Sequence, residues 1–119
     1  MRATIEAVAY QTHDLFEAMK HDGLRPKIVK VDGGMVMNNW FSQFLSDIVN
    51  VKVLRPKVQE TTALGAAFMA GLNIGVYKSL KDISKNWQLD KKFSSKMKNS
   101  SRNILIDGWE KAVKRALIN

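Results

Sequence analysis

The stretch VKVDGGMVMNNWFSQFLSDI, residues 29–48, decides the expected fold of this chain. A β-branched apolar run over 28–31 ends at two glycines, Gly33 and Gly34, and a pair of asparagines then opens a segment with large apolar residues at helical spacing. Valine and isoleucine favour strands, and asparagine is a favourable N-cap. The stretch therefore predicts a strand covered on both faces, a glycine loop, and a helix that starts at Asn38 or Asn39.

The same reasoning extends to the neighbouring segments. Residues 2–20 place apolar side chains at three- and four-residue steps, which predicts an amphipathic helix. Residues 51–54, VKVL, predict a second strand, and we expect Arg55 and Pro56 to stop it, because the residue before a proline is restricted.

The second half of the chain carries one strong helical pattern and one weak region. The window 63–77 is the most apolar, and we interpret the helix predicted over 60–74 as buried, since the window is too short to span a bilayer. Residues 78–101 are rich in lysine and serine with weak periodicity, and we expect a surface excursion there. Residues 102–118 predict a closing helix.

This order of elements places the chain in the α/β class. Strands that alternate with helices imply a parallel or mixed sheet with right-handed crossovers. Two strands are too few for a stable open sheet, so we expect residues 1–119 to form a single partial domain. Within it, residues 1–77 make the α/β core, and residues 78–119 make a basic excursion and the closing helix.

Composition and charge restrict the possible functions. The chain has 119 residues, 45% of them apolar, which is typical of a folded protein, and no cysteine, which excludes disulfides and thiolate chemistry and suits a cytoplasmic location. Of the net charge of +8, residues 1–77 carry +1 (eight basic, seven acidic) and residues 78–119 carry +7 (eleven basic, four acidic). A basic tail can attract nucleic acid or acidic membranes, but a solvated surface is the favoured interpretation, and we expect neither a membrane nor a specific nucleic-acid partner.

The Gly33-Gly34 loop has two interpretations. Ligands of open α/β sheets bind beyond the carboxyl ends of the strands, and glycine lets a base or ribose press against backbone. An asparagine at the start of the following helix offers a donor and an acceptor to a purine edge. Alternatively, the loop is only a strand-to-helix turn, with Asp32 bonding to backbone and Asn39 capping. The loop matches neither a Walker P-loop nor the G-x-G-x-x-G fingerprint.

Other kinds of site find little support. His13 and His21 are isolated, which predicts no metal site. Asp32 and Asp47 are candidate polar anchors, but no pair of carboxylates suggests an acid and a base, so we assign no catalytic residue.

Two blocks carry a resemblance to a known family. The block VDGGMVMNNWFSQFLSDI, residues 31–48, and the block VKVLRPKVQETTALGAAFMAGLNIG, residues 51–75, resemble the C-terminal part of the glycerol kinases in the FGGY carbohydrate kinase family. The DGG, NN, RP and ETTALGAA elements stand in family order and spacing. Residues 2–19 and 108–117 resemble the family's preceding long helix and its closing helix.

The resemblance implies a fold and a phosphotransferase activity. The fold is the C-terminal part of an actin/hexokinase-like (ribonuclease H-like) domain, and the nucleotide is ATP or ADP held between two lobes. ATP with Mg²⁺ on its phosphates then phosphorylates glycerol to glycerol 3-phosphate. By resemblance, the backbone of Gly34, beside Gly33, contacts the nucleotide, and Asn38 hydrogen-bonds its adenosine part.

The resemblance also shows what this sequence lacks. The family's catalytic aspartate, both phosphate loops and the glycerol pocket have no counterpart here. We therefore expect a C-terminal fragment that is inactive alone and works with a separate chain carrying the N-terminal lobe, with glycerol bound only in the complete enzyme. The alternatives are a non-catalytic remnant or interaction module and, less favoured, a weak nucleic-acid binder that uses the basic tail.

Overall fold

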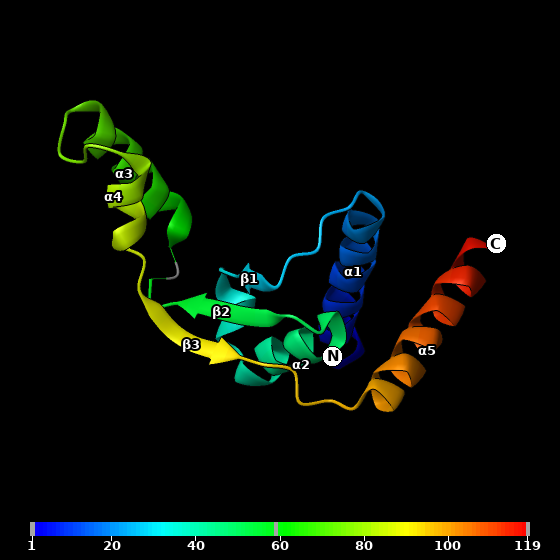
Figure 1. Ribbon diagram of the computed structural model, residues 1–119. Helices are drawn as coiled ribbons and strands as arrows, with labels where there is room; N and C mark the ends of the chain where they lie inside the picture. Colours follow the sequence, from blue (N-terminus) through cyan, green and yellow to red (C-terminus); the bar gives the residue numbers. More distant parts are fainter. Residues whose placement is uncertain (1, 59, 119) are drawn as a thin grey trace.

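The computed structural model describes residues 2–58 and 60–118. The chain is elongated, with extents of 54 × 27 × 27 Å, and Figure 1 follows it from end to end. Its elements, in order, are α1 (Arg2–His21), β1 (Ile28–Lys30), the 3-10 helix η1 (Gly34–Met37), α2 (Asn39–Val49), β2 (Lys52–Pro56), α3 (Thr61–Asn73), α4 (Leu80–Lys85), β3 (Leu89–Phe93) and α5 (Asn99–Leu117).

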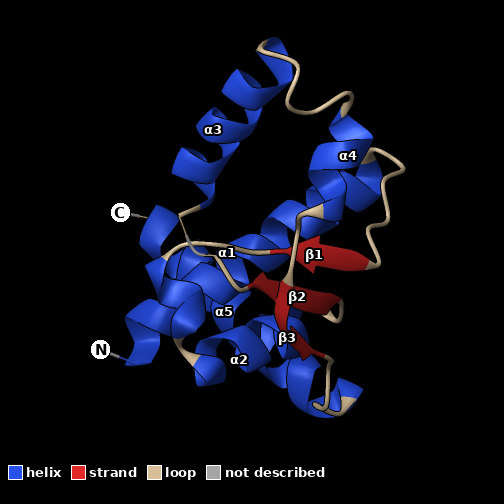
Figure 2. Ribbon diagram, turned by 90° about the vertical axis from the view of Figure 1, so that its left-hand side faces the viewer, coloured by secondary structure: helices blue, strands red, loops and turns tan. Residues whose placement is uncertain are grey.

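The three strands form a mixed sheet, as the sequence predicted for this α/β chain. β1 runs parallel to β2, with Val29 opposite Val53, and β3 runs antiparallel to β2, with Phe93 opposite Val53. Figure 2 shows the three strands side by side, with β2 in the middle. Two parallel strands joined through α2 bring their carboxyl ends to the same edge of the sheet.

The prediction of only two strands was wrong, because β3 lies within the stretch expected to be a surface excursion. Four of its five residues are exposed, among them Lys91 and Lys92, and only Phe93 is buried. Lysines are common on edge strands, where they oppose pairing with another chain. Such a strand lacks the apolar alternation by which strands are predicted.

Two details of the other strands also differ from expectation. Arg55 and Pro56 belong to β2 instead of stopping it, because an irregularity in the pairing with β3 falls between them and accommodates the proline. β1 is not covered on both faces, since Ile28 is 52% exposed and Val29 is only half-buried. β1 is an edge strand, and its outer side has no partner among the described residues.

The core is built mainly by α2, as its helical spacing predicted. Five buried apolar residues of α2 meet three from α1 and one each from η1, β2 and β3: Phe41, Phe44, Leu45, Ile48, Val49; Ala9, Tyr10, Phe16; Val36, Val53 and Phe93. Trp40, in the first turn of α2, is 42% exposed and stacks on Phe44 at a centroid distance of 5.0 Å.

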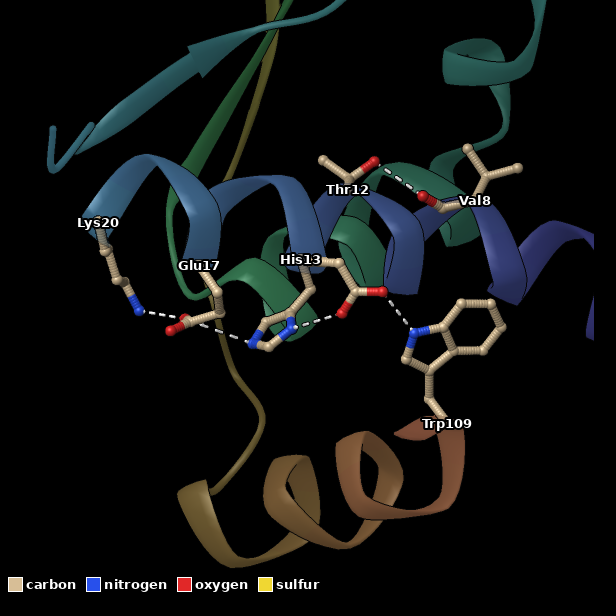
Figure 3. Close-up of polar contacts among 7 residues, drawn as sticks. Val8, Thr12, His13, Glu17, Lys20 and Trp109 are labelled. Atoms are coloured by element: carbon tan, nitrogen blue, oxygen red, sulfur yellow. Dashed lines mark hydrogen bonds and ion pairs between the residues drawn. The ribbon is translucent and has the colours of Figure 1, made fainter. Parts of the chain in front are cut away.

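α5 docks on α1 through Trp109. The indole ring stacks on Tyr10 at a centroid distance of 5.5 Å, and its Nε1 donates a hydrogen bond to Asp14 at 2.8 Å. Figure 3 shows this contact beside a row of polar side chains along α1, in which Lys20 pairs with Glu17 and His13 lies 3.6 Å from Glu17. The bond from Lys20 lowers the pKa of Glu17, and burial raises the pKa of Tyr10.

The expectation that the helix over 60–74 is buried was wrong. Only Gly71 of α3 is buried, and Met69 is 54% exposed. α3 packs mainly on the turn that follows it, where the Tyr77 ring meets Phe68 edge-on at 5.6 Å. Figure 1 shows α3 and α4 at the end of the molecule opposite α1 and α5. Within the described residues, no helix combines the length and the apolar content that crossing a membrane requires.

We expect Trp109→Ala to detach α5 from α1. The substitution removes the stack on Tyr10 and the bond to Asp14, and loss of a large packed aromatic costs about 3 kcal/mol of unfolding free energy. Urea unfolding followed by circular dichroism measures the change. Trp109→Phe is the matched variant, because it keeps an aromatic stack, loses only the hydrogen bond, and should cost about 1 kcal/mol. An Ala variant that unfolds like the parent contradicts this docking.

Candidate functional site

The loop between β1 and α2 lies at the carboxyl edge of the parallel strands. The Val31 amide donates to Leu54 O at 3.1 Å, which extends the pairing of β1 and β2 by one residue. The chain then turns at Gly33, whose φ of 90° and ψ of 169° are a conformation restricted to glycine. η1 follows directly, so Gly33 is required by the backbone itself.

The outer face of this loop is open. A Cβ atom built on Gly33 or on Gly34 meets no heavy atom within 4 Å, and both residues are exposed. Gly34 has no positive φ, so its lack of a side chain is not explained by its backbone conformation. The bare backbone at Gly34 is therefore available to a flat group from solvent.

Asn38, and not Asn39, caps α2. Asn38 Oδ1 accepts hydrogen bonds from the amides of Trp40 at 2.9 Å and Phe41 at 3.3 Å. This corrects the interpretation in which Asn39 is the cap. Asn38 Nδ2 donates none of the hydrogen bonds found among residues 2–58 and 60–118, and the residue is exposed. The Asn38 acceptor therefore serves the fold, while its donor faces solvent.

Arg55 is the residue that the sequence analysis missed. Its side chain is buried, and Nη1 donates to Val36 O at 2.9 Å, Met37 O at 3.1 Å and Asn39 Oδ1 at 3.1 Å. Nε and Nη2 lie 2.8 Å from Asp90 Oδ2 on β3. One signal could have revealed it: Arg55 follows the fully buried Val53 by two positions, and residues two apart on a strand share a face.

Two hollows border the start of the loop, and Val31 and Asp32 line both. One, of about 220 Å³, lies at the strand ends and also includes Lys30, Pro56, Thr61 and Trp87. The other, of about 310 Å³, is mostly apolar and is shared by α1, β1, η1 and α2. Gly33, Gly34 and Asn38 line neither hollow, so the open face of the loop is a surface.

The two aspartates proposed as polar anchors have different environments. Asp47 Oδ1 accepts from the amides of Lys96 at 2.6 Å and Met97 at 3.2 Å, so it fixes the segment before α5. Asp32 is exposed and has no hydrogen bond among the described residues, so the expected bond from Asp32 to backbone is not found. In that part of the chain no three His, Asp or Glu side chains gather as metal ligands.

The sequence and the fold of the chain both match a family of carbohydrate kinases. Residues 1–74 match the family model "FGGY family of carbohydrate kinases, C-terminal domain". The chain therefore belongs to this family. The curated relatives include glycerol kinase of Gluconobacter oxydans, 51% identical over 117 residues, and glycerol kinase 1 of Pseudomonas aeruginosa, 52% identical over 113 residues. The alignments cover 98% and 95% of this chain but 23% of each relative, so the chain spans about a quarter of their length.

Solved structures give the same result. The crystal structure of Plasmodium falciparum glycerol kinase with ADP aligns with a TM-score of 0.84 and 38% identity, over 99% of this chain and 24% of that one. A ligand-bound xylulose kinase from Lactobacillus acidophilus aligns with a TM-score of 0.79 at 24% identity, over 98% of this chain and 24% of that one, which supports the fold alone. The resemblance to FGGY kinases and the partial actin/hexokinase-like α/β fold are thereby confirmed.

We expect Asn38→Ala to lower the unfolding free energy by about 1 kcal/mol, because the first amides of α2 lose their acceptor. Asn38→Asp keeps an acceptor at the same place and should unfold like the parent. Urea denaturation of the three proteins measures the difference. Equal stability of parent and Ala variant contradicts the capping role.

Proposed function

We propose that this chain forms the adenosine-binding part of a glycerol kinase. In the complete enzyme, the γ-phosphate of ATP passes to glycerol and gives glycerol 3-phosphate. One observation carries the proposal: the chain aligns over 99% of its length, at 38% identity, with a glycerol kinase solved with ADP. The open backbone at Gly34 and the solvent-facing donor of Asn38 fit an adenosine ligand.

Each loop residue has a separate role in this proposal. Gly33 gives the backbone its turn, Gly34 lets the ribose or base lie against the peptide, and Asn38 Nδ2 donates to adenosine. The N-terminus of α2 adds a partial positive charge nearby. ATP with Mg²⁺ supplies the phosphoryl group, and positioning with charge neutralisation is the main demand of such transfer. The metal reaches the site on the nucleotide phosphates.

The proposal assigns the remaining machinery to other parts of the enzyme. The catalytic base, the phosphate loops and the glycerol pocket belong to other lobes of the enzyme, in the same or a separate chain. These lobes correspond to the roughly three quarters of the relatives' length that this chain does not cover. The exposed apolar side chains of α3 fit a surface that those lobes cover. We keep residues 1–119 as a single partial domain, with the α/β core of residues 1–77 extended by β3 from the basic excursion. A cytoplasmic location is also part of the proposal, supported by the absence of cysteine.

Gly34→Val tests the nucleotide assignment. Because the space around Gly34 is empty and its φ is not positive, the variant should fold like the parent. The valine side chain then occupies the place of the ribose or base and should abolish ADP binding. Calorimetry on this chain, and kinase assays on the P. aeruginosa enzyme with its matching segment replaced by this chain, provide the measurements.

Two controls separate binding from folding. Gly33→Ala should lower stability by about 1–3 kcal/mol, because alanine tolerates that backbone conformation poorly. Asn38→Ser keeps the cap but loses the Nδ2 donor, so it should weaken ADP binding about five- to tenfold without loss of stability. A Gly34→Val hybrid enzyme that binds ADP normally refutes the assignment, and a folded, inactive parent hybrid supports the non-catalytic remnant.

We expect the 119-residue chain alone to show no ATP-dependent phosphorylation of glycerol. Its sequence offers no counterpart of the family's catalytic aspartate or phosphate loops. An assay of ADP release with glycerol and Mg²⁺ is sufficient, with the hybrid enzyme as the positive control. Turnover by the pure chain contradicts the proposed division of labour.

A further inference from the structure

The Arg55 guanidinium reaches under the glycine loop from the middle strand of the sheet. We propose that Arg55 is the positioning residue of this loop and sets its affinity for the adenosine part of the nucleotide. The nucleotide part of this inference rests on the proposed function. The positioning part stands on geometry alone, because three acceptors on or beside the loop converge on one Nη1 atom.

The acceptors need such a donor. Val36 O and Met37 O belong to the last residues of η1, where a helix leaves its carbonyl groups without partners in the helix. Arg55 Nη1 donates to both, and the fully buried Ser42 hydroxyl also donates to Val36 O, at 2.7 Å. The inner side of the loop is thus held from β2 and α2, while its outer side stays open at Gly34.

The opposite edge of the guanidinium is fixed as well. Asp90 Oδ2 lies 2.8 Å from both Nε and Nη2, which orients the planar group and directs Nη1 at the loop. Lysine cannot reproduce this arrangement, because a single ammonium group cannot serve a carboxylate on one side and three oxygens on the other. The side chain of Arg55 therefore defines where the loop lies relative to the sheet.

The consequence for binding is preorganisation. A ligand that meets an already ordered loop does not have to pay for ordering it, so its affinity is higher. Arg55 lies behind the loop and is buried, with an exposed fraction of 6%. We therefore expect it to affect nucleotide affinity through the placement of Gly34 and Asn38, and not through direct contact.

The chain offers a matched control in Arg102. Its exposed fraction is 7%, against 6% for Arg55, and it also bridges several acceptors: Asp47 O at 2.5 Å, Asn99 Oδ1 at 2.6 Å, Ser95 Oγ at 2.7 Å and Met97 O at 3.2 Å. None of these groups belongs to the glycine loop. Arg55→Lys and Arg102→Lys therefore remove comparable buried interactions at two different places.

The experiment uses the full 119-residue chain labelled with ¹⁵N. Amide hydrogen exchange at Asn38, whose N–H bonds to Met35 O, reports loop order, and titration with ADP reports affinity. Arg55→Lys should speed exchange at Asn38, relative to the centre of α2, by about tenfold and weaken ADP binding by a similar factor, as expected for the loss of a charge-assisted hydrogen bond. Arg102→Lys should lower global stability but leave both quantities within about twofold of the parent.

Each outcome has one meaning. Unchanged exchange at Asn38 in Arg55→Lys, or an equal change in Arg102→Lys, overturns the positioning role. If Arg55→Lys speeds exchange at Asn38 but the parent binds no ADP, alone or in the hybrid enzyme, the positioning role stands and the proposed function is refuted. Should Arg55→Lys not fold, Asn39→Ala removes one acceptor from the exposed side of the network. It should then speed exchange at Asn38 about threefold, and no change overturns the inference.

Discussion

The buried Arg55 guanidinium is the interaction on which the arrangement of sheet and loop depends. A charged group out of water is strongly unfavourable unless its donors find acceptors, so its surroundings must supply them together. Asp90 of β3 stands on one side, and the carbonyl groups that end η1 stand on the other. A shift of β3 along β2 would leave the charge unpaired, and a different course of the loop would leave Nη1 without its carbonyl acceptors. The register of the sheet and the shape of the loop are therefore coupled.

The core helix α2 is tied to its surroundings by arginine at both ends. At its start, Arg55 bonds to Asn39, and near its end, Arg102 of α5 donates to Asp47 O. Between these points the helix is held by apolar packing, which has no direction of its own, and by hydrogen bonds from Ser42 to Val36 O, Gln43 to Ser94 O and Ser46 to Val51 O. These polar contacts supply the direction, because hydrogen bonds fix which turn of α2 lies against which strand or loop.

The sequence predicted the elements with strong periodicity and missed those held by polar contacts. α1, α2 and the parallel strands follow from apolar spacing, and the glycine loop follows from its position between a strand and a helix. β3 was missed because an exposed edge strand of lysines carries no apolar alternation, and Arg55 was read as a strand end because the proline beside it dominated the pattern. The choice between Asn38 and Asn39 as cap depends on a single turn of backbone, which spacing cannot resolve.

For α3 the sequence pattern predicted the helix correctly but its burial wrongly. A helix that is apolar around most of its circumference, with alanine and glycine along it, is typical of close packing on all sides. Here Gly71 alone is buried, and the Phe68–Tyr77 contact covers only part of the remainder. The curated relatives are about four times as long as the matched part, and under the proposed function their additional lobes cover this helix. Under that proposal, the exposed helix of small residues and the open glycine loop have one explanation, since small residues let another lobe or a nucleotide approach the backbone closely.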